Sequence, residues 1–326
     1  MFTSRDIEFR TIFVIDCIHN RNLRVSNGEL LLEETTKDDK VKTLTKLPFQ
    51  KIFALFIVGH ISITTPLIEK CQKYGVALIV VKPNYRPIFF WSSPAEANYL
   101  LRQRQHQYTE NDNLTIAKIL VTNKIQNQSR ALIHTRMKDT STTSAIEQCN
   151  NLIPLIQACP NYSQLMGIEG SASKAFFSAF FQSYNWQARR PRTKCDAINA
   201  TLDIGYTILF YYIECFLRLF GFDLYVGVYH RLWFKRKSLV CDIMEPFRCI
   251  IDKTVRIAFN RKQISDSDFK INNGEYILKR EKNKVYQKLF FDALIPYKID
   301  TFKYVQAYYR CFMQKKSEPH FPQFNI

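Results

Sequence analysis

Short apolar runs separated by turn residues predict β-strands from residue 11 to about residue 91. Asn27-Gly28 lies between two of these runs, and Asn-Gly between alternating apolar positions is the strongest short signal for a β-hairpin. Between two later runs, IFALFIVG and VALIVV, residues 65–75 have Pro66 at the first helical position and Gly75 at the end, which predicts a helix. The N-terminal region should therefore be rich in strands and contain one helix.

The apolar positions take a helical period after about residue 91. FKINNGEYIL around Gly274 is the exception and predicts one late hairpin. Strands followed by a series of helices indicate an α+β protein, with a boundary near residues 91–95. The predicted helices cover residues 95–108, 113–137, 143–158, 171–186, 195–220 and 239–259.

The chain is strongly basic. Its 326 residues include 46 Lys and Arg against 29 Asp and Glu, a formal charge of +17, which favours a polyanionic partner such as nucleic acid or an anionic membrane. The apolar run 205–228 carries Glu214, Arg218 and Asp223, and charges at membrane depth are costly, so we expect a buried helix in which Glu214 and Arg218 pair. The charged start of the chain does not resemble a secretory signal. Nine scattered cysteines without a CxxC pair indicate reduced thiols, and we expect a cytoplasmic protein.

The candidate chemistry lies in residues 229–248, YHRLWFKRKSLVCDIMEPFR. Asp242 and Glu245 are three residues apart, so on one helix both carboxylates can point into one site. A solvated acidic pair is the ordinary alternative, but the helix is apolar and His230 lies nearby. Carboxylates with one imidazole suit Mg²⁺ or Mn²⁺, and the surrounding cations suit phosphate. Glu169, which we expect near a helix start, is a candidate third ligand, although the helix dipole also favours Glu there.

Three linked segments resemble one family. GIEGSASKAFF, RRPRTKCDAINATLDIGYTIL and YHRLWFKRKSLVCDIMEPFR, in this order across residues 167–248, are similar to the CRISPR-associated spacer integrases, the endonucleases of the CRISPR adaptation module. LRQRQ at residues 101–105 resembles the LRxxQ stretch at the start of that family's helical domain, and the Asn27-Gly28 hairpin fits its N-terminal domain. The resemblance covers essentially the whole chain.

The resemblance implies a site. Glu169 matches the family's first metal ligand, His230 the second and Glu245 the third, with Asp242 as an accessory catalytic residue and Mg²⁺ or Mn²⁺ as the ion. The family's third ligand is Asp in some members, so Asp242 stays an alternative to Glu245. Cys195-Asp196-Ala197 and Asp203 depart from the family pattern, but neither segment belongs to the metal set.

The resemblance also implies an architecture and a reaction. The expected fold is an N-terminal β-sandwich-like domain that dimerises, residues 1–92, followed by a larger all-α catalytic domain, residues 93–326. The 3′-OH of a short DNA fragment, the spacer, would attack a phosphodiester at a CRISPR repeat end, and water would replace the 3′-OH in the related hydrolysis. The implied partners are DNA, a second copy of the chain and a small ferredoxin-like companion protein.

The basic segments would bind DNA in a salt-dependent, sequence-tolerant way, although a solvated face is the ordinary reading of any single charge run. Tyr184, Trp186 and Trp233 are candidates to stack on bases, but we expect two of the three to be core residues. The run 279–288 is a further candidate for phosphate contacts. The DNA-binding candidates are Arg189, Arg190, Arg192, Lys235, Arg236, Lys237 and Arg248.

Two rival functions remain at this point. A related integrase of a mobile element would use the same chemistry on terminal repeats, and its genome neighbourhood would differ. A non-catalytic DNA-binding scaffold could keep the fold, but it has no need of the three ligands Glu169, His230 and Glu245.

Overall fold

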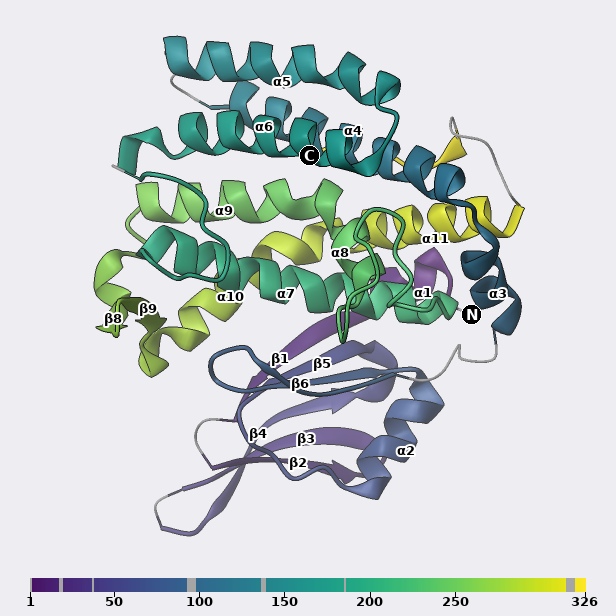
Figure 1. Ribbon diagram of the computed structural model, residues 1–326. Coiled ribbons are helices and arrows are strands. Elements are labelled where there is room, and N and C mark those ends of the chain that lie inside the picture. Colours follow the sequence, from purple (N-terminus) through teal and green to yellow (C-terminus); the bar gives the residue numbers. More distant parts are fainter. Residues whose placement is uncertain are drawn as a thin grey trace.

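The computed structural model describes residues 2–17, 20–36, 38–92, 98–135, 139–184, 186–314 and 320–326. Strands of the N-terminal part form the lower half of the molecule in Figure 1, and layers of helices lie above them. This arrangement confirms the α+β class. The expected boundary at residues 92/93 adjoins residues 93–97, which lie outside the described residues, so the division into 1–92 and 93–326 stays a prediction.

Two sheets make up the N-terminal part. The first has the order β1-β5-β6-β7, in which β1 and β6 run parallel to β5 and β7 runs antiparallel to β6. The second is the antiparallel sheet β2-β3-β4. Helix α2 connects the parallel strands β5 and β6. The bounds are β1 Thr11–Asp16, β2 Arg21–Ser26, β3 Glu29–Thr35, β4 Val41–Pro48, the 3₁₀ turn η1 Phe49–Lys51, β5 Ile52–Val58, α2 Thr65–Tyr74, β6 Ala77–Val81 and β7 Pro87–Trp91.

Strand β5 is buried on both faces of the first sheet, and its successive side chains point to opposite sides. Leu55 and Ile57 join an apolar core shared with Leu23 and Leu30 of the second sheet. Phe56 points the other way, and its ring lies 5.0 Å from that of Phe291 in the helical part. The first sheet is thus packed between the second sheet and the helices, as the sandwich-like prediction required.

The predicted turns are present. Asn27 and Gly28 have φ of 51° and 79° between β2 and β3, the left-handed conformation that a type I′ turn needs. Gly75 ends α2 with φ of 65°. The late hairpin pairs β8, Phe269–Asn272, with β9, Glu275–Leu278.

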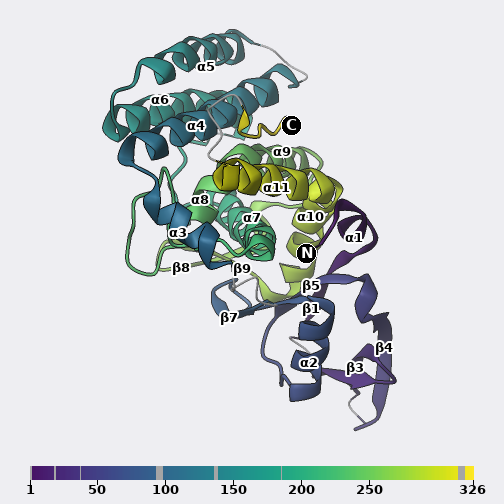
Figure 2. The same cartoon turned by 90° about the vertical axis from the view of Figure 1, so that its right-hand side faces the viewer.

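The helical part is built around α7, Ala197–Phe220, which contacts α8, α9, α10 and α11. Figure 2 shows the short N-terminal helix α1, Ser4–Phe9, at the side of this body, where it packs against α11. The remaining helices are α3 Tyr99–Gln107, α4 Glu110–Ile133, α5 Thr140–Ala158, α6 Tyr162–Phe180, α8 Ser238–Met244, α9 Arg248–Asn260, α10 Asn283–Leu294 and α11 Lys298–Gln314. The 3₁₀ turns are η2 Gln182–Tyr184, η3 Glu245–Phe247, η4 Asp266–Asp268, η5 Arg280–Lys282 and η6 Ile295–Tyr297.

Within the described residues, α7 alone is long and apolar enough to cross a membrane, but 78% of its apolar window is buried inside the protein. Gly205 allows close packing, since a Cβ there would lie 2.5 Å from Ile251 and 2.6 Å from Phe290. Buried Glu214 accepts a hydrogen bond of 2.9 Å from Arg218 Nε, which confirms the predicted pair. The nine cysteines have free thiols, seven of them buried.

The predictions for α6 and for a continuous helix over residues 239–259 are wrong. Glu169 lies inside α6 rather than near a helix start, because Asn161 caps the helix by accepting a hydrogen bond from the Gln164 N–H at 3.0 Å, and Gly167 and Gly170 are helical. The predicted helix 239–259 is interrupted at η3, where Pro246 cannot donate the hydrogen bond that a continuous helix requires. Helices α1, α10 and α11 were not predicted. The predicted end at Met137 lies outside the described residues.

Candidate active site

The centre of the candidate site is a lysine between two carboxylates. Lys124 lies on α4, and its ammonium forms an ion pair with Glu169 on α6 and another, of 2.7 Å, with Glu245 at the start of η3. The Lys124 side chain is only 9% exposed and that of Glu245 only 4%, whereas Glu169 is 21% exposed. The fold therefore brings together Glu169 and Glu245, which are 76 positions apart in the sequence, around one positive charge.

A second cation lies beside Glu245. Arg248 Nε is 3.0 Å from Glu245 Oε2. Burial alone would raise the pKa of Glu245, but the charges of Arg248 and Lys124 outweigh burial and lower that pKa to about 2. Glu245 is therefore ionised in the folded protein at all physiological pH values.

His230 is held by Asp242. The Asp242 carboxylate accepts backbone hydrogen bonds from Val228 at 2.6 Å, Tyr229 at 3.1 Å and His230 at 2.8 Å, and its Oδ1 lies 2.6 Å from His230 Nδ1. Asp242 is fully buried, whereas the His230 side chain is 27% exposed. A carboxylate that fixes Nδ1 in this way leaves Nε2 as the free ring nitrogen, which is the usual arrangement behind a metal-binding histidine.

The loop before His230 has no room for a side chain at Gly227. A Cβ there would lie 2.6 Å from Asp242 Oδ2 and 2.9 Å from the Ser238 backbone carbon. Tyr162 on α6 donates a hydrogen bond of 3.0 Å to the Val228 carbonyl. The loop is therefore fixed from both α8 and α6, and His230 has little freedom to move.

Asp242 and Glu245, which we predicted to point into one site with Glu245 as a ligand and Asp242 as an accessory, make different contacts. Asp242 binds the 228–230 backbone and His230, while Glu245 binds Lys124 and Arg248. The physical reason is the break at Pro246, which takes Glu245 out of the regular helix that carries Asp242.

The site has the donor types that a hard divalent cation prefers. Glu169 and Glu245 offer oxygens and His230 offers a nitrogen. The buried Glu245 Oε2 faces two cations, Lys124 Nζ at 2.7 Å and Arg248 Nε at 3.0 Å, and the Lys124 ammonium lies between the Glu169 and Glu245 carboxylates. In the described part of the chain, however, no three His, Cys, Asp or Glu side chains are close enough together to hold a metal ion. The residues fit such an ion in type and charge, provided that the Lys124 ammonium yields its position.

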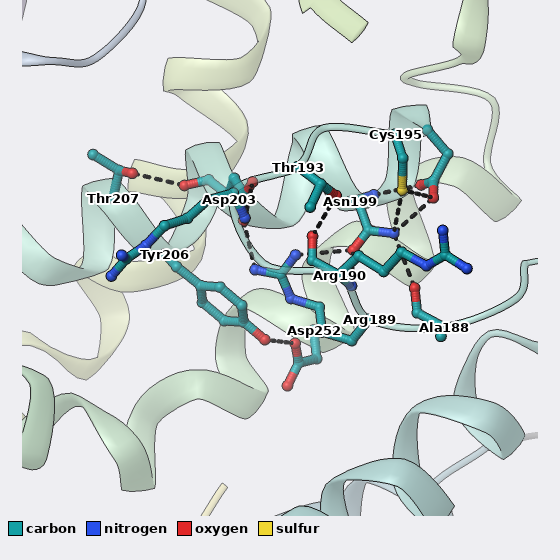
Figure 3. Close-up of polar contacts among 12 residues, drawn as sticks. Ala188, Arg189, Arg190, Thr193, Cys195, Asn199, Asp203, Tyr206, Thr207 and Asp252 are labelled. Atoms are coloured by element: carbon teal, nitrogen blue, oxygen red, sulfur yellow. Dashed lines mark hydrogen bonds and ion pairs between the residues drawn. The ribbon is translucent and has the colours of Figure 1, made fainter. Parts of the chain in front are cut away.

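Residues 189–194, RRPRTK, form a basic connector between α6 and α7 that lies against α7 (Figure 3). Arg189 donates to Asp203 Oδ1 at 2.6 Å and to Asn199 Oδ1 at 2.9 Å. The backbone N–H groups of Arg190 and Arg192 donate to Asn199 and Asp203 at 2.8 Å and 3.0 Å. Asp203, one of the departures from the family pattern, thus anchors the connector. The side chains of Arg190 and Arg192 are exposed, whereas Arg189 is engaged within the protein.

Contacts of Arg189 and Tyr206 extend from the connector to the residues beside Glu245. The Arg189 and Arg248 guanidinium groups lie 5.3 Å and 4.7 Å from the Tyr206 ring centre. Tyr206 donates a hydrogen bond to Asp252 (Figure 3). Burial raises the pKa of Asp252 to about 6, despite the Tyr206 hydrogen bond and the nearby Arg248 charge. The network links the connector to the cation beside Glu245.

The other DNA-binding candidates also divide into side chains that are engaged within the protein and side chains that are exposed. Lys237 donates to buried Glu214 at 2.6 Å, Arg248 is paired with Glu245, and Arg236 donates to the Arg231 carbonyl. Lys235 is exposed. In the run 279–288, Lys279 donates to the Ser267 carbonyl at 2.8 Å and Lys282 pairs with Asp268, so these two support the η4 turn.

Two of the three candidate stacking residues are packed against the core, as expected. Trp186 donates to Asp196 at 3.2 Å and lies against Phe181, and Tyr184 donates to the Arg256 carbonyl at 3.0 Å. Trp233 is 73% exposed.

Sequence reasoning missed Lys124. The signal was present in the helix sequence VTNKIQNQS, where Asn123, Lys124, Asn127 and Gln128 recur at the spacing of one helical face within an apolar helix. All four are buried in the structure. A buried polar face of this kind needs partners. For Asn123 and Asn127 these are the Phe324 and Pro246 carbonyls, and for Lys124 they are the two carboxylates of the site.

Comparison with known proteins gives the family. The family model described as "CRISPR associated protein Cas1" matches residues 18–291. This chain belongs to the Cas1 family. The "CRISPR-associated endonuclease Cas1 1" of Thermodesulfovibrio yellowstonii is 31% identical over 253 residues, which cover 74% of this chain and 80% of that protein.

Solved structures share the Cas1 fold. The structure titled "Cas6-RT-Cas1--Cas2 complex" has a TM-score of 0.79 at 21% identity, covering 97% of this chain and 36% of the larger chain in it. The structure titled "Casposase bound to integration product" has a TM-score of 0.78 at 17% identity, covering 97% of this chain and 96% of that chain.

Proposed function

We propose that this Cas1 family member is a metal-dependent DNA endonuclease and integrase of CRISPR adaptation. It would join short DNA fragments into the CRISPR array by attack of a fragment 3′-OH on a repeat phosphodiester, with hydrolysis as the related activity. The observation that carries the proposal is the pair Glu169 and Glu245 around one cation, beside a histidine fixed by Asp242, in a chain of this family.

Each residue of the site has a proposed role. Glu169, His230 and Glu245 would hold Mg²⁺ or Mn²⁺, and the bound ion would polarise the phosphoryl oxygen and stabilise the negative charge that builds on it. Asp242 positions His230 through Nδ1 and through the backbone of residues 228–230. Arg248 keeps Glu245 ionised.

Exposed cations of the connector and the loop after His230 would contact DNA phosphates. Arg190, Arg192 and Lys235 are exposed and not committed to a carboxylate by any ion pair within the described residues. Their contacts would be salt-dependent and indifferent to sequence. Arg189, Lys237 and Arg248 would act indirectly, by holding the connector, the loop and Glu245 in place.

The proposed partners follow from the proposed reaction. DNA supplies both the spacer fragment and the repeat, a second copy of the chain would dimerise through the β-sandwich-like part, and a small ferredoxin-like companion protein would complete the complex. The fold shared with the "Cas6-RT-Cas1--Cas2 complex" supports a companion of this kind. A protein that acts on the CRISPR array works where the DNA is, and we propose a cytoplasmic location on that basis.

The casposase-like fold supports one alternative, an integrase of a mobile element that acts on terminal repeats. The family model and the relative from Thermodesulfovibrio yellowstonii favour CRISPR adaptation. A plasmid carrying a CRISPR repeat and a plasmid carrying transposon ends, offered together as targets, would separate the two functions.

The test is Glu169→Ala. This change removes one proposed ligand and leaves the exposed cations in place, so joining and nicking of DNA should be abolished while DNA binding stays within a few fold. The assay is transfer of a labelled fragment into a repeat-bearing plasmid, with binding measured on the same DNA. Equal loss of binding and joining would mean that Glu169 supports the structure rather than the reaction.

A further inference from the structure

The loop after His230 forms a fixed turn. The Arg236 N–H donates to the Trp233 carbonyl at 3.0 Å, and Lys235 between them has φ of 59°. Because a non-glycine residue adopts this left-handed conformation only where its surroundings impose it, the turn has a defined shape. We call residues 231–235 the aromatic turn.

Both ends of the aromatic turn are anchored. Before it, the backbone of residues 228–230 is bound by buried Asp242. After it, Ser238 donates to the Arg231 carbonyl at 3.1 Å, and Lys237 donates to buried Glu214 at 2.6 Å. These hydrogen bonds hold the two ends of the turn in place. The tip therefore cannot pack onto the protein surface unless they break.

The tip presents three large apolar side chains to solvent in succession. Leu232 is 70% exposed, Trp233 73% and Phe234 82%. Single exposed apolar residues are ordinary, but a contiguous group held in a rigid turn is typical of a binding surface. Rigid aromatic side chains also lose little entropy on binding.

The surroundings of the tip are positive. Arg231, at one end of the turn, is 77% exposed and forms a surface ion pair of 3.9 Å with Glu110, which is itself 79% exposed. Lys235, at the other end, has its Nζ 5.0 Å from the Phe234 ring centre. Trp233 is three residues after His230, so at most about 11 Å of backbone separates their Cα atoms. In a chain of the Cas1 family, aromatic rings flanked by cations suit nucleic acid, because bases stack on the rings while the cations contact phosphates.

We infer that the aromatic turn is a base-stacking site, at which Trp233 and Phe234 stack on unpaired bases of a DNA end beside the reacting phosphate. Arg231 and Lys235 hold the adjoining phosphates. The inference rests on the proposed function in that it takes DNA as the substrate, and it assigns the contact with unpaired bases to Trp233 and Phe234.

The test uses the full chain in a Glu169→Ala background, which prevents turnover. The probe is a duplex with a short single-stranded 3′ end that carries 2-aminopurine. Binding should quench the fluorescence of 2-aminopurine in the overhang, and the double change Trp233→Ala with Phe234→Ala should abolish the quenching. Affinity for the overhang DNA should fall at least about fivefold, while affinity for blunt duplex stays within about twofold.

Two controls isolate stacking. Trp233→Phe should keep most of the quenching because an aromatic face remains. Phe9→Ala removes a ring that is similarly exposed, at 69%, on α1 and should change nothing. Persistent quenching in the double alanine variant would overturn the inference. Light scattering of the double alanine variant supplies a second check. A lower mass than that of the unchanged protein, with unchanged DNA affinity, would also overturn the inference and make the turn a contact between protein chains.

The outcome is independent of the proposed reaction. If Glu169→Ala joins DNA as well as the unchanged protein, the proposed catalytic site is wrong while the quenching result still stands. If joining depends on Glu169 but the double alanine variant still quenches, the stacking site is wrong and the proposed function stands.

Discussion

Replacing Lys124 by methionine removes the ammonium between Glu169 and Glu245 and keeps a long side chain in the helix. Glu245 is then a buried carboxylate with Arg248 as its remaining charged partner. Removing one partner of a buried ion pair costs about 3–5 kcal/mol, and the surviving Arg248 contact places the expected loss at the lower end, about 3 kcal/mol. At about 2 °C per kcal/mol for a large domain, the metal-free midpoint should fall by about 6 °C.

The same change should strengthen the effect of a divalent cation. In the unchanged protein an added ion must displace the Lys124 ammonium, whereas in Lys124→Met it meets two carboxylates without that competitor. Thermal unfolding with a chelator and with excess Mn²⁺ should therefore show a larger Mn²⁺-dependent rise of the midpoint in the variant. Direct titration with Mn²⁺ should show tighter binding as well.

Lys118→Met is the matched control, because Lys118 lies on the same helix but is half-buried and donates an exposed hydrogen bond of 2.9 Å to the Gln157 carbonyl, with no ion pair to a carboxylate among the described residues. It should change neither the midpoint nor the Mn²⁺ response. A Mn²⁺-dependent rise in Lys124→Met no larger than in the unchanged protein would refute the reasoning that the ammonium occupies the position of a metal ion.

Three further predictions follow from named contacts. Gly227→Ala brings a Cβ within 2.6 Å of Asp242 Oδ2, so the loop must shift; stability should fall by about 1–3 kcal/mol and joining by at least about tenfold, measured by urea unfolding and strand transfer. Asp252 has its pKa raised from 3.8 to about 6, so the folded carboxyl binds its proton more tightly than the unfolded one, and stability should fall by about 2 kcal/mol as pH rises from about 4 to 6. Asp252→Asn should remove that slope in urea unfolding across this range, and an unchanged slope would assign it to another group. Changing Arg190 and Arg192 to Gln should lower the slope of log affinity against log salt by about two without changing the thermal midpoint, and an unchanged slope would remove these two residues from the DNA interface.

The sequence was sufficient for features that depend on local chemistry. The Asn27-Gly28 hairpin and the end of α2 at Gly75 follow from positive φ, and the Glu214–Arg218 pair follows from helical spacing. The strand-to-helix change also appears directly in the period of the apolar positions. Glu169, His230 and Asp242 came from composition together with the family resemblance.

Features that depend on tertiary contacts were not predictable in the same way. Lys124 is a residue of α4 in the sequence, and only the packing of α4 against α6 and η3 makes it the centre of the carboxylate cluster. Arg189 and Arg190 look alike in the sequence, but Asp203 engages the side chain of Arg189 and the connector leaves that of Arg190 exposed. The start of α6 was misplaced because Gly167 and Gly170 outweighed the Asn161 cap.

The central claim concerns which carboxylates act directly, and half-site joining of a labelled fragment into a repeat-bearing plasmid, titrated with Mn²⁺, tests it most directly. Glu245→Ala should be inactive at every Mn²⁺ concentration because a proposed ligand is gone. Asp242→Asn should be slowed by about 10–100-fold and partly rescued by excess Mn²⁺, because Asp242 positions His230 rather than binding the ion. An inactive Asp242→Asn at saturating Mn²⁺, with activity retained in Glu245→Ala and both proteins folded, would contradict the account and make Asp242 the direct ligand.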